Sequence, residues 1–327
     1  MSAPSADASP AVSHAASDRA LRLTWAGVAA LLVVAPFAGV YPIFVMGGLC
    51  FAIFAMAFNL LLGFTGLLSF GHAAFFGGAA YVSGWLMQAH GATPEVAIAA
   101  GTLAAAAMGL VVGVIAIRRE GIYFAMVTLA LAQMLYYFFL KAPFTGGEDG
   151  IQGIPRGKLF GVVSLNDDLA LYWFILIVFG AAFLLVHRVV HSPYGQVLKA
   201  IRENEPRAVS LGYDVARYKL LAFVLSASLA GLGGALKPLV LHLATLEDVH
   251  WEQSGAVILM TLLGGLGTFS GPVVGAFTVY GLRYFLADRA GSWTNVIIGV
   301  IFVLCVVAFR KGFVGELLAA RNRSRSR

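Results

Sequence analysis

The chain has 327 residues, of which 60% are hydrophobic and only 12% are charged, and its mean hydropathy is +0.85. Soluble domains carry roughly a quarter charged residues, so this composition excludes a soluble globular protein and predicts an integral membrane protein. The net charge of +6 does not indicate nucleic-acid binding, because residues 310–327 hold six basic residues and one acid. Basic residues beside a last span are typical of the cytoplasmic side, so 313–327 is expected to be a basic cytoplasmic tail.

The first 22 residues are rich in Ala, Ser and Asp and show no apolar periodicity. They do not resemble a signal peptide, whose charged end directly precedes its apolar core. We expect residues 1–22 to form a disordered cytoplasmic N-terminus, followed by a transmembrane domain over residues 23–312. Arg19 and Arg22 precede the first apolar run and favour a cytoplasmic position for that end.

Apolar runs follow one another through the transmembrane domain, and a span needs about 20 such residues. The uncharged run 253–282 is too long for one straight span and too short for two. GGLGTFSGP lies in its middle, so residues 253–288 should form either two short spans or a re-entrant pair. We predict an all-α, polytopic integral membrane protein with about 10 transmembrane helices, some short or broken. The expected spans are residues 24–40, 42–63, 66–87, 94 to the charges at 118–120, 122–140, 169–186, 220–236, two within 253–288, and 293–309.

The distribution of basic residues predicts the topology. If the chain starts in the cytoplasm and crosses the membrane ten times, every basic cluster and both termini lie in the cytoplasm. The expected location is the inner (plasma) membrane of the cell. The loop 141–168 and the segment 237–253 then face outward, into the periplasm. His72 is the one candidate for an ionisable side chain at the centre of a span, whereas ion-coupled transporters usually carry buried carboxylates there. If the protein moves a solute, the energy is therefore expected to enter from elsewhere.

The largest polar interruption is the cytoplasmic loop 191–219, which carries five basic and three acidic residues. Ser192 before Pro193 indicates a helix start, since a hydroxyl cap precedes a residue whose missing N–H costs nothing there. Asn204 indicates a second start, and Gly212 supplies a left-handed stop. We predict two short helices on the membrane surface that present a docking element to a soluble partner. Their expected apolar contacts are Val197, Leu198, Ile201, Val209 and Leu211.

A short motif occurs twice in the chain. LLGFTGLLS at 61–69 and LLGGLGTFS at 262–270 share the pattern LLGxxGxxS at an offset of 201 residues. Both copies lie at expected inner ends of spans with the same orientation, as a parallel internal repeat requires. Glycine-rich apolar sequence also produces such matches by chance, so packing and repetition both remain open.

Small polar residues in the spans are candidates for a solute path. Such groups either bond neighbouring helices or line a route for a polar solute, and the sequence leaves both interpretations open. Cys50 and Cys305 lie in apolar runs with neither disulfide nor metal-ligand spacing, so they are expected to be buried hydrophobes. The translocation candidates are Asn59, Ser69, His72, Thr128 and Gln133.

Four stretches of the sequence are similar to one family. They are FNLLLGFTGLLSFGHAAFFGGAAY, FTGGEDGIQGIP, GQVLKAIRENEPRAVSLGYDVARYKLLAFVLSASLAGLGGAL and TLLGGLGTFSGPVVGA. They resemble the branched-chain amino-acid permeases of ATP-binding-cassette importers over about residues 51–312. TGGxDGI together with AIRENExxAxxLGxxVxRYKLLAF is specific to the subgroup that pairs with a second, shorter permease.

The resemblance implies an import complex of two different permease subunits as a heterodimer, two cytoplasmic ATPase subunits and a periplasmic solute-binding protein. It also implies that the loop 191–219 carries a coupling helix that seats in a groove of the ATPase. In the wider superfamily this loop has the sequence pattern Glu-Ala-Ala-x-x-x-Gly, whereas Pro206 and Arg207 occupy the positions of Glu-Ala here. Small Ala208 suits a helix pressed into a groove. The matching coupling positions are Ala200, Arg202, Glu203, Asn204, Ala208 and Gly212.

The main hypothesis is a permease subunit that moves branched-chain amino acids (Leu, Ile and Val) inward, driven by ATP hydrolysis on its partners. The chain has no nucleotide-binding motif of its own and no catalytic or metal-ligand cluster, so it is expected not to be an enzyme and to need no cofactor or metal. The same importer class for amides, urea or aromatic acids is an alternative. A standalone secondary transporter or channel is an alternative of a different class, and an embedded enzyme lacks support.

Overall fold

The computed structural model describes residues 41–293 and 296–301, with four single positions outside these ranges. The chain forms two units, residues 1–42 and 43–327, and each is described by itself. The elements below belong to the second unit, apart from the first residue of α2. The expected N-terminal segment and the basic tail lie outside the described residues, as do nearly all of the first expected span and most of the last.

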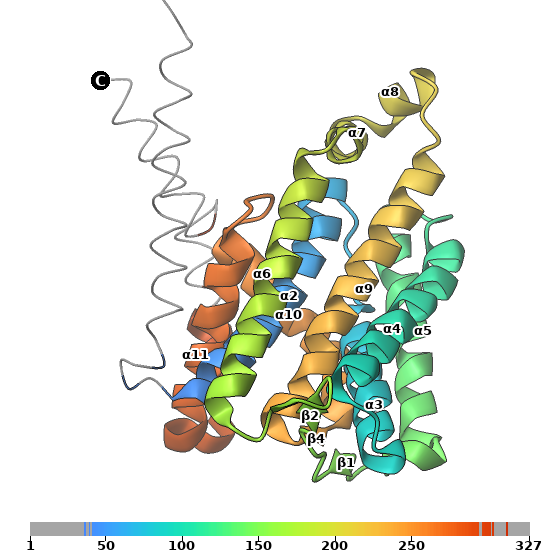
Figure 1. Cartoon of the computed structure of the whole chain (residues 1–327). Coiled ribbons are helices and arrows are strands. Elements are labelled where there is room, and N and C mark those ends of the chain that lie inside the picture. Colours follow the sequence, from blue (N-terminus) through green and yellow to red (C-terminus); the bar gives the residue numbers. More distant parts are fainter. Residues whose placement is uncertain are drawn as a thin grey trace, which may run out of the picture. The chain divides into compact units, whose positions relative to one another are not determined.

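Helices dominate the described part of the chain (Figure 1). Eight of them are long: α2 (Pro42–Thr65), α3 (His72–His90), α4 (Pro94–Ala116), α5 (Gly121–Lys141), α6 (Asp168–His191), α9 (Val215–Leu241), α10 (Trp251–Gly264) and α11 (Gly271–Ala290). The short elements are α7 (Pro193–Glu203), α8 (Glu205–Ser210), η1 (Pro143–Thr145), η2 (Leu246–Asp248) and η3 (Gly291–Trp293). Four two-residue strands complete the set: β1 (Ile151–Gln152), β2 (Lys158–Leu159), β3 (Val163–Ser164) and β4 (Leu243–Ala244).

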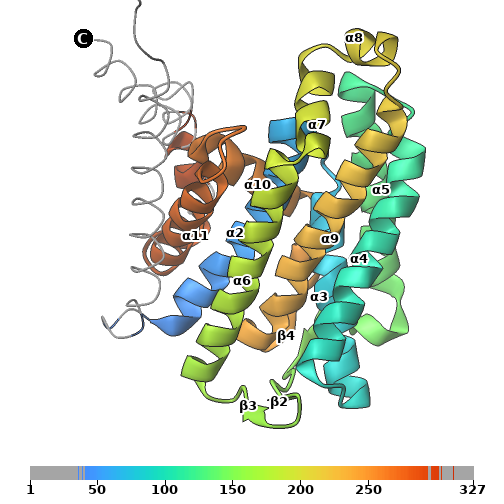
Figure 2. The same ribbon diagram turned by 45° about the horizontal axis from the view of Figure 1, so that its top comes forward.

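The long helices lie side by side and leave the short elements at two opposite ends (Figures 1 and 2). Helices α7 and α8 lie at one end, which we call the α7–α8 end. The strands lie at the other, which we call the strand end. There β1 pairs antiparallel with β4 and β2 with β3, which closes the connection between α5 and α6 against the end of α9. These strands are the departure from an all-α chain.

Burial differs strongly among the helices. The most apolar window of α2 is 94% buried and that of α9 is 67% buried, so these two helices form the centre. The corresponding windows of α4, α5 and α6 are only 33%, 28% and 33% buried, although they are strongly apolar. Apolar side chains exposed on this scale require lipid or another membrane subunit as their surroundings.

Five of the described helices are long and apolar enough to cross a membrane: α2, α4, α5, α6 and α9. Helix α10 has 14 residues and extends about 21 Å, which is shorter than the roughly 30 Å hydrocarbon core. The polytopic helical character is confirmed, while the expected count of about 10 spans is not. Two separate helices do occupy 253–288, with a break over 265–270.

Several helix boundaries differ from the sequence-based prediction, and those of α3 and α9 matter for the sites described below. Helix α3 begins at His72 instead of 66, because Gly66 takes a left-handed φ of +81° and the chain stays irregular to Gly71. A β-carbon on Gly66 would strain this turn, so the glycine ends α2 and does not open the next span. Helix α9 begins at Val215 and continues to Leu241, which brings Lys237 and Pro238 inside a helix that was expected to stop at 236.

Candidate functional site

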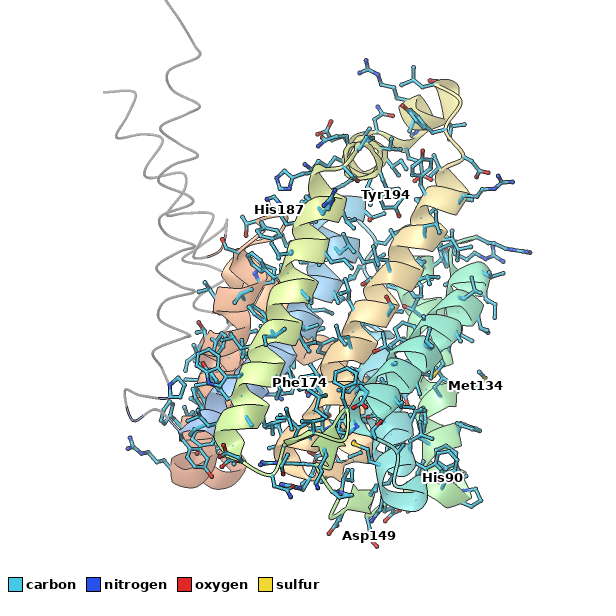
Figure 3. The ribbon with its side chains drawn as sticks, viewed as in Figure 1. His90, Met134, Asp149, Phe174, His187 and Tyr194 are labelled. Atoms are coloured by element: carbon cyan, nitrogen blue, oxygen red, sulfur yellow. The ribbon has the colours of Figure 1, made fainter. Side chains whose placement is uncertain are left out.

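The loop between α6 and α9 folds as the sequence predicts. The Ser192 hydroxyl accepts a hydrogen bond from the Gly195 amide at 3.3 Å and caps α7. The Asn204 side chain accepts from the Arg207 amide at 3.0 Å and caps α8, and Gly212 has a φ of +86°. Both predicted short helices are confirmed, as are the two helix caps Ser192 and Asn204 and the left-handed Gly212. Figure 3 shows Tyr194 of α7 at this end of the molecule, far from Asp149 at the strand end.

The loop has a small core and an internal ion pair. Ile201, Ala208 and Val215 form the buried cluster, with Val197 packed against it. Lys219 and Glu205 pair at 2.5 Å, with side chains 6% and 31% exposed. The Tyr194 hydroxyl donates to the Tyr218 carbonyl at 3.0 Å, and burial of the ring raises the pKa of that hydroxyl. These contacts join α7 and α8 into one element on the end of α9.

The expected apolar contacts of this element divide into two groups. Leu198 and Ile201 are buried within the chain, whereas Val209 is 56% and Leu211 68% exposed, so a contact of these two side chains with a membrane or a partner stays a prediction. Ala208, expected to face a groove of another subunit, is 2% exposed and packs inside the loop. The reason is that α8 turns Ala208 toward α7 and α9. The other predicted coupling residues, Ala200, Arg202, Glu203, Asn204 and Gly212, are exposed.

Arg202 joins the α7–α8 element to the helix ends below it. Its guanidinium donates to the carbonyl oxygen of Gly63, and it lies against Gly267 in the loop between α10 and α11. Lys199 of the same helix lies 5.8 Å above the ring of Phe64. A cavity of about 390 Å³ opens beside these groups. A movement of α7 would therefore act directly on both helix–loop–helix connections. The cavity is lined by Gly63, Phe64, Lys199, Arg202, Glu203 and Gly267.

Asn59, two residues before the first copy of the LLGxxGxxS motif, bonds to the second copy. Its Oδ1 accepts from the Gly267 amide at 3.0 Å, and its Nδ2 donates to the Thr268 carbonyl at 2.9 Å. Gly66 and Gly267, which occupy the same motif position, both take left-handed φ values, +81° and +71°. In each copy a helix ends and a left-handed glycine follows, and the next helix starts shortly after the copy. This shared geometry is what an internal repeat requires.

Two of the other translocation candidates, His72 and Thr128, bond groups distant in the sequence, whereas the Ser69 hydroxyl accepts from the nearby Gly71 amide. Ser69, His72 and Thr128 are 0% exposed. The Nε2 of His72 lies 2.8 Å from the Ser226 hydroxyl, which itself donates to the Ala57 carbonyl, and Thr128 accepts from the Phe70 amide at 3.2 Å. Because Ser226 already donates to a carbonyl, His72 donates to Ser226.

Rings of Phe58, Phe75 and Phe223 surround the imidazole of His72 edge-on. Its Nδ1 is buried without a hydrogen-bond partner among the described residues. Gln133 is half-buried on α5. In the described conformation His72 lies in a closed aromatic site, and the role of these side chains in a solute path stays a prediction.

The structure adds a buried ion pair that sequence reasoning missed. Lys237 of α9 donates to both carboxylate oxygens of Asp248 in η2, and their side chains are 10% and 2% exposed. Asp248 also accepts from the Thr245 hydroxyl at 3.2 Å. The backbone of η2 lies so close to α3 that a β-carbon on Gly77 would fall 2.5 Å from Asp248. The only signal in the sequence was a lysine at the end of an apolar run.

No group of three or more His, Cys, Asp or Glu side chains that could hold a metal occurs in the part of the chain that the structure describes. Cys50 is buried, as expected, and Cys305 lies outside the described residues. The polar side chains at the α7–α8 end and at the strand end thus form hydrogen bonds and ion pairs.

Together, the apolar helices and the polar elements at their two ends define a multi-pass α-helical membrane protein. Residues 41–306 match the family described as the branched-chain amino acid transport system permease component, and the chain belongs to this family. Members of this family are permease subunits in the inner membrane and are not themselves enzymes.

Individual relatives are distant. The chain is 27% identical to the high-affinity branched-chain amino acid transport permease LivM of Escherichia coli, over 79% of this chain and 66% of that protein. It is 26% identical to a probable branched-chain amino acid permease LivH of Methanocaldococcus jannaschii, over 45% of this chain and 49% of the other. It is also 27% identical to the ribose import permease RbsC of Escherichia coli, over 66% and 69%. The chain thus spans just under two thirds of LivM, and no solved structure matches it.

Proposed function

We propose that the chain is the membrane-spanning permease subunit of an ATP-binding-cassette importer that moves branched-chain amino acids inward. ATP hydrolysis on two cytoplasmic partner subunits drives the movement. A second, homologous permease subunit completes the membrane part as a heterodimer, and a periplasmic binding protein delivers the solute. The family match supports the class of protein, and the similarity to LivM supports the solute.

The α7–α8 element is the single observation that carries the mechanism. It is a unit at one end of the long helices, and through Arg202 it contacts the end of α2 and the loop between α10 and α11. Val209 and Leu211 on its outer side are exposed apolar side chains beside basic Arg207. In the proposal this surface docks on the ATPase, and the α7–α8 end and both termini face the cytoplasm. Closure of the ATPase pair then pushes α7 against the two loops and tilts the spans.

The exposed apolar faces of α4, α5 and α6 fit the proposed assembly. Leu103, Ile122 and Ile177 are 69%, 70% and 69% exposed, on three different helices. A membrane subunit with such faces is surrounded by lipid and by the second permease. The strand end, with the short sheets of the connection between α5 and α6, faces the solute-binding protein in this arrangement.

A standalone secondary transporter is the second candidate, and the buried Lys237–Asp248 pair is the observation that favours it. Ionisable residues inside the membrane often mark ion or proton pathways. Here, however, the pair is closed by the Thr245 cap and packed against α3, which is the arrangement of a structural link. We therefore keep the importer as the proposed function.

The substrate is tested with the complete complex: both permease subunits, the ATPases and the binding protein in proteoliposomes. A panel of leucine, isoleucine, valine, urea, an aliphatic amide, phenylalanine and ribose is offered to the binding protein, and stimulation of ATP hydrolysis is measured. The proposal predicts stimulation by the three branched-chain amino acids. Stimulation only by another member of the panel would contradict the proposed substrate. The proposal that the chain is an importer permease would still stand.

A further inference from the structure

A polar cavity of about 450 Å³ lies between η2 and the second half of α11. This volume is within the range of small-molecule sites. Side chains from α5, η2, α10 and α11 meet there, so elements distant in the sequence build it. The cavity is lined by Tyr136, Leu246, Glu247, His250, Glu252, Gln253, Arg283 and Ala287.

Arg283 provides the positive charge of this cavity. Its Nε is buried and has no hydrogen-bond partner among the described residues. One terminal nitrogen donates to the amide oxygen of Gln253 at 3.3 Å. No described carboxylate lies within ion-pair distance of the guanidinium, although Glu247 and Glu252 are close enough to act on it electrostatically. A buried donor without a partner is costly, so the unused side of the guanidinium is suited to an anionic ligand.

The side chains that line the cavity favour one kind of anion, a carboxylate. A guanidinium binds a carboxylate through two parallel hydrogen bonds, and its geometry favours that planar group. Glu247 and Glu252 also line this cavity, and their carboxylate oxygens can accept hydrogen bonds from a cation. Leu246, Ala287 and the ring of Tyr136 supply apolar surface. A ligand that satisfies all three features carries a carboxylate, an ammonium group and an apolar side chain on one small frame.

We propose that this cavity binds the zwitterionic head of an apolar amino acid on its way through the permease. Arg283 holds the carboxylate, the Glu247 and Glu252 carboxylates hold the ammonium group, and Gln253 positions Arg283. The inference deepens the proposed function and rests on it, since it assigns a solute site within this subunit in addition to the binding protein. It gives the permease a means to reject solutes that lack either charge.

The test measures direct binding of three probes to the complete complex in lipid nanodiscs, without the solute-binding protein, by saturation-transfer NMR. The probes are leucine, leucinamide, which lacks the carboxylate, and 4-methylpentanoate, which lacks the ammonium group. The wild-type complex should bind leucine at least about tenfold more tightly than either analogue, because each analogue loses one charge-assisted contact. Arg283→Gln should weaken leucine at least about tenfold and abolish the preference over leucinamide. The double variant Glu247→Gln, Glu252→Gln should abolish the preference over 4-methylpentanoate.

Arg289→Gln is the matched control, because Arg289 is exposed on the same helix and does not line the cavity. It should bind all three probes as the wild type does. Arg283→Lys keeps the charge without the planar fork, so it should lie between wild type and Arg283→Gln. If the Arg283→Gln complex does not assemble, the Arg283→Lys variant is used in its place.

Three results would overturn the inference. One is equal binding of leucine by the Arg283 and Arg289 variants, and another is a wild-type complex that does not distinguish leucine from leucinamide. The third is an Arg283 effect that follows the content of anionic lipid in the nanodisc and disappears in phosphatidylcholine, which would assign the site to a lipid phosphate. These failures leave the proposed function standing if the wild-type complex still takes up leucine. A wild-type complex that takes up no amino acid would instead sink the proposed function itself.

Discussion

The buried Lys237–Asp248 pair yields the sharpest prediction about stability. In Asp248→Asn the side chain keeps its shape and an oxygen that can accept from Thr245, but Lys237 loses its counter-charge. Removing one partner of a buried pair costs about 3–5 kcal/mol, because the remaining charge is left uncompensated. With side chains 10% and 2% exposed, water cannot replace the carboxylate without opening η2 from α3. We therefore expect a large fall in stability from the loss of a single charge.

The double variant Lys237→Met, Asp248→Asn is the matched control. Replacing both charges with uncharged side chains removes the uncompensated buried charge, so this variant should recover a large part of the lost stability. Thermal unfolding of the purified complex measures the effect, and ATP-dependent uptake is measured in parallel. A stable double variant with wild-type uptake is the expected result. Equal loss in the single and double variants would refute the reasoning, and a stable double variant without uptake would show that the pair takes part in transport.

The remaining predictions concern the α7–α8 end. Asn59→Ala removes two part-buried hydrogen bonds to the loop between α10 and α11 and should destabilise the complex by about 0.5–1.5 kcal/mol for each bond lost, as thermal unfolding would reveal. Arg202→Ala should raise the ATP hydrolysed per solute imported, since α7 loses its contact with Gly63; an unchanged ratio would argue against that link. Leu211→Asp should weaken ATPase binding about tenfold or more in a pull-down titration without unfolding the loop. Ala208→Glu should unfold the loop instead, because that side chain is 2% exposed, and a folded loop in this variant would contradict the assignment.

Local signals in the sequence predicted the α7–α8 element well. Ser192, Asn204 and Gly212 act on backbone groups within three residues, so their roles depend little on the rest of the fold. The orientation of α8 was not accessible in the same way. Which of Ala208, Val209 and Leu211 turns inward is decided by packing against α7 and α9, and a six-residue helix offers too few residues to define a face.

Other features depend on contacts that a linear pattern does not contain. Gly66 could serve close helix packing or end a helix, and only the left-handed turn in the structure decides between these roles. Lys237 and Asp248 are separated by a loop that must fold back onto α3 before they can meet, so each looked like an ordinary loop residue. Arg283 was hidden for the same reason, because its cavity is assembled from four elements.

In the proposed function, ATP hydrolysis on partner subunits drives this chain through the α7–α8 element. The most direct measurement is uptake of labelled leucine into proteoliposomes that hold the complete complex, with ATP present or absent and with proton and sodium gradients collapsed. We expect uptake that requires ATP, persists without ion gradients and is lost in Leu211→Asp. Uptake that follows an ion gradient, needs no ATP and survives that substitution would contradict it.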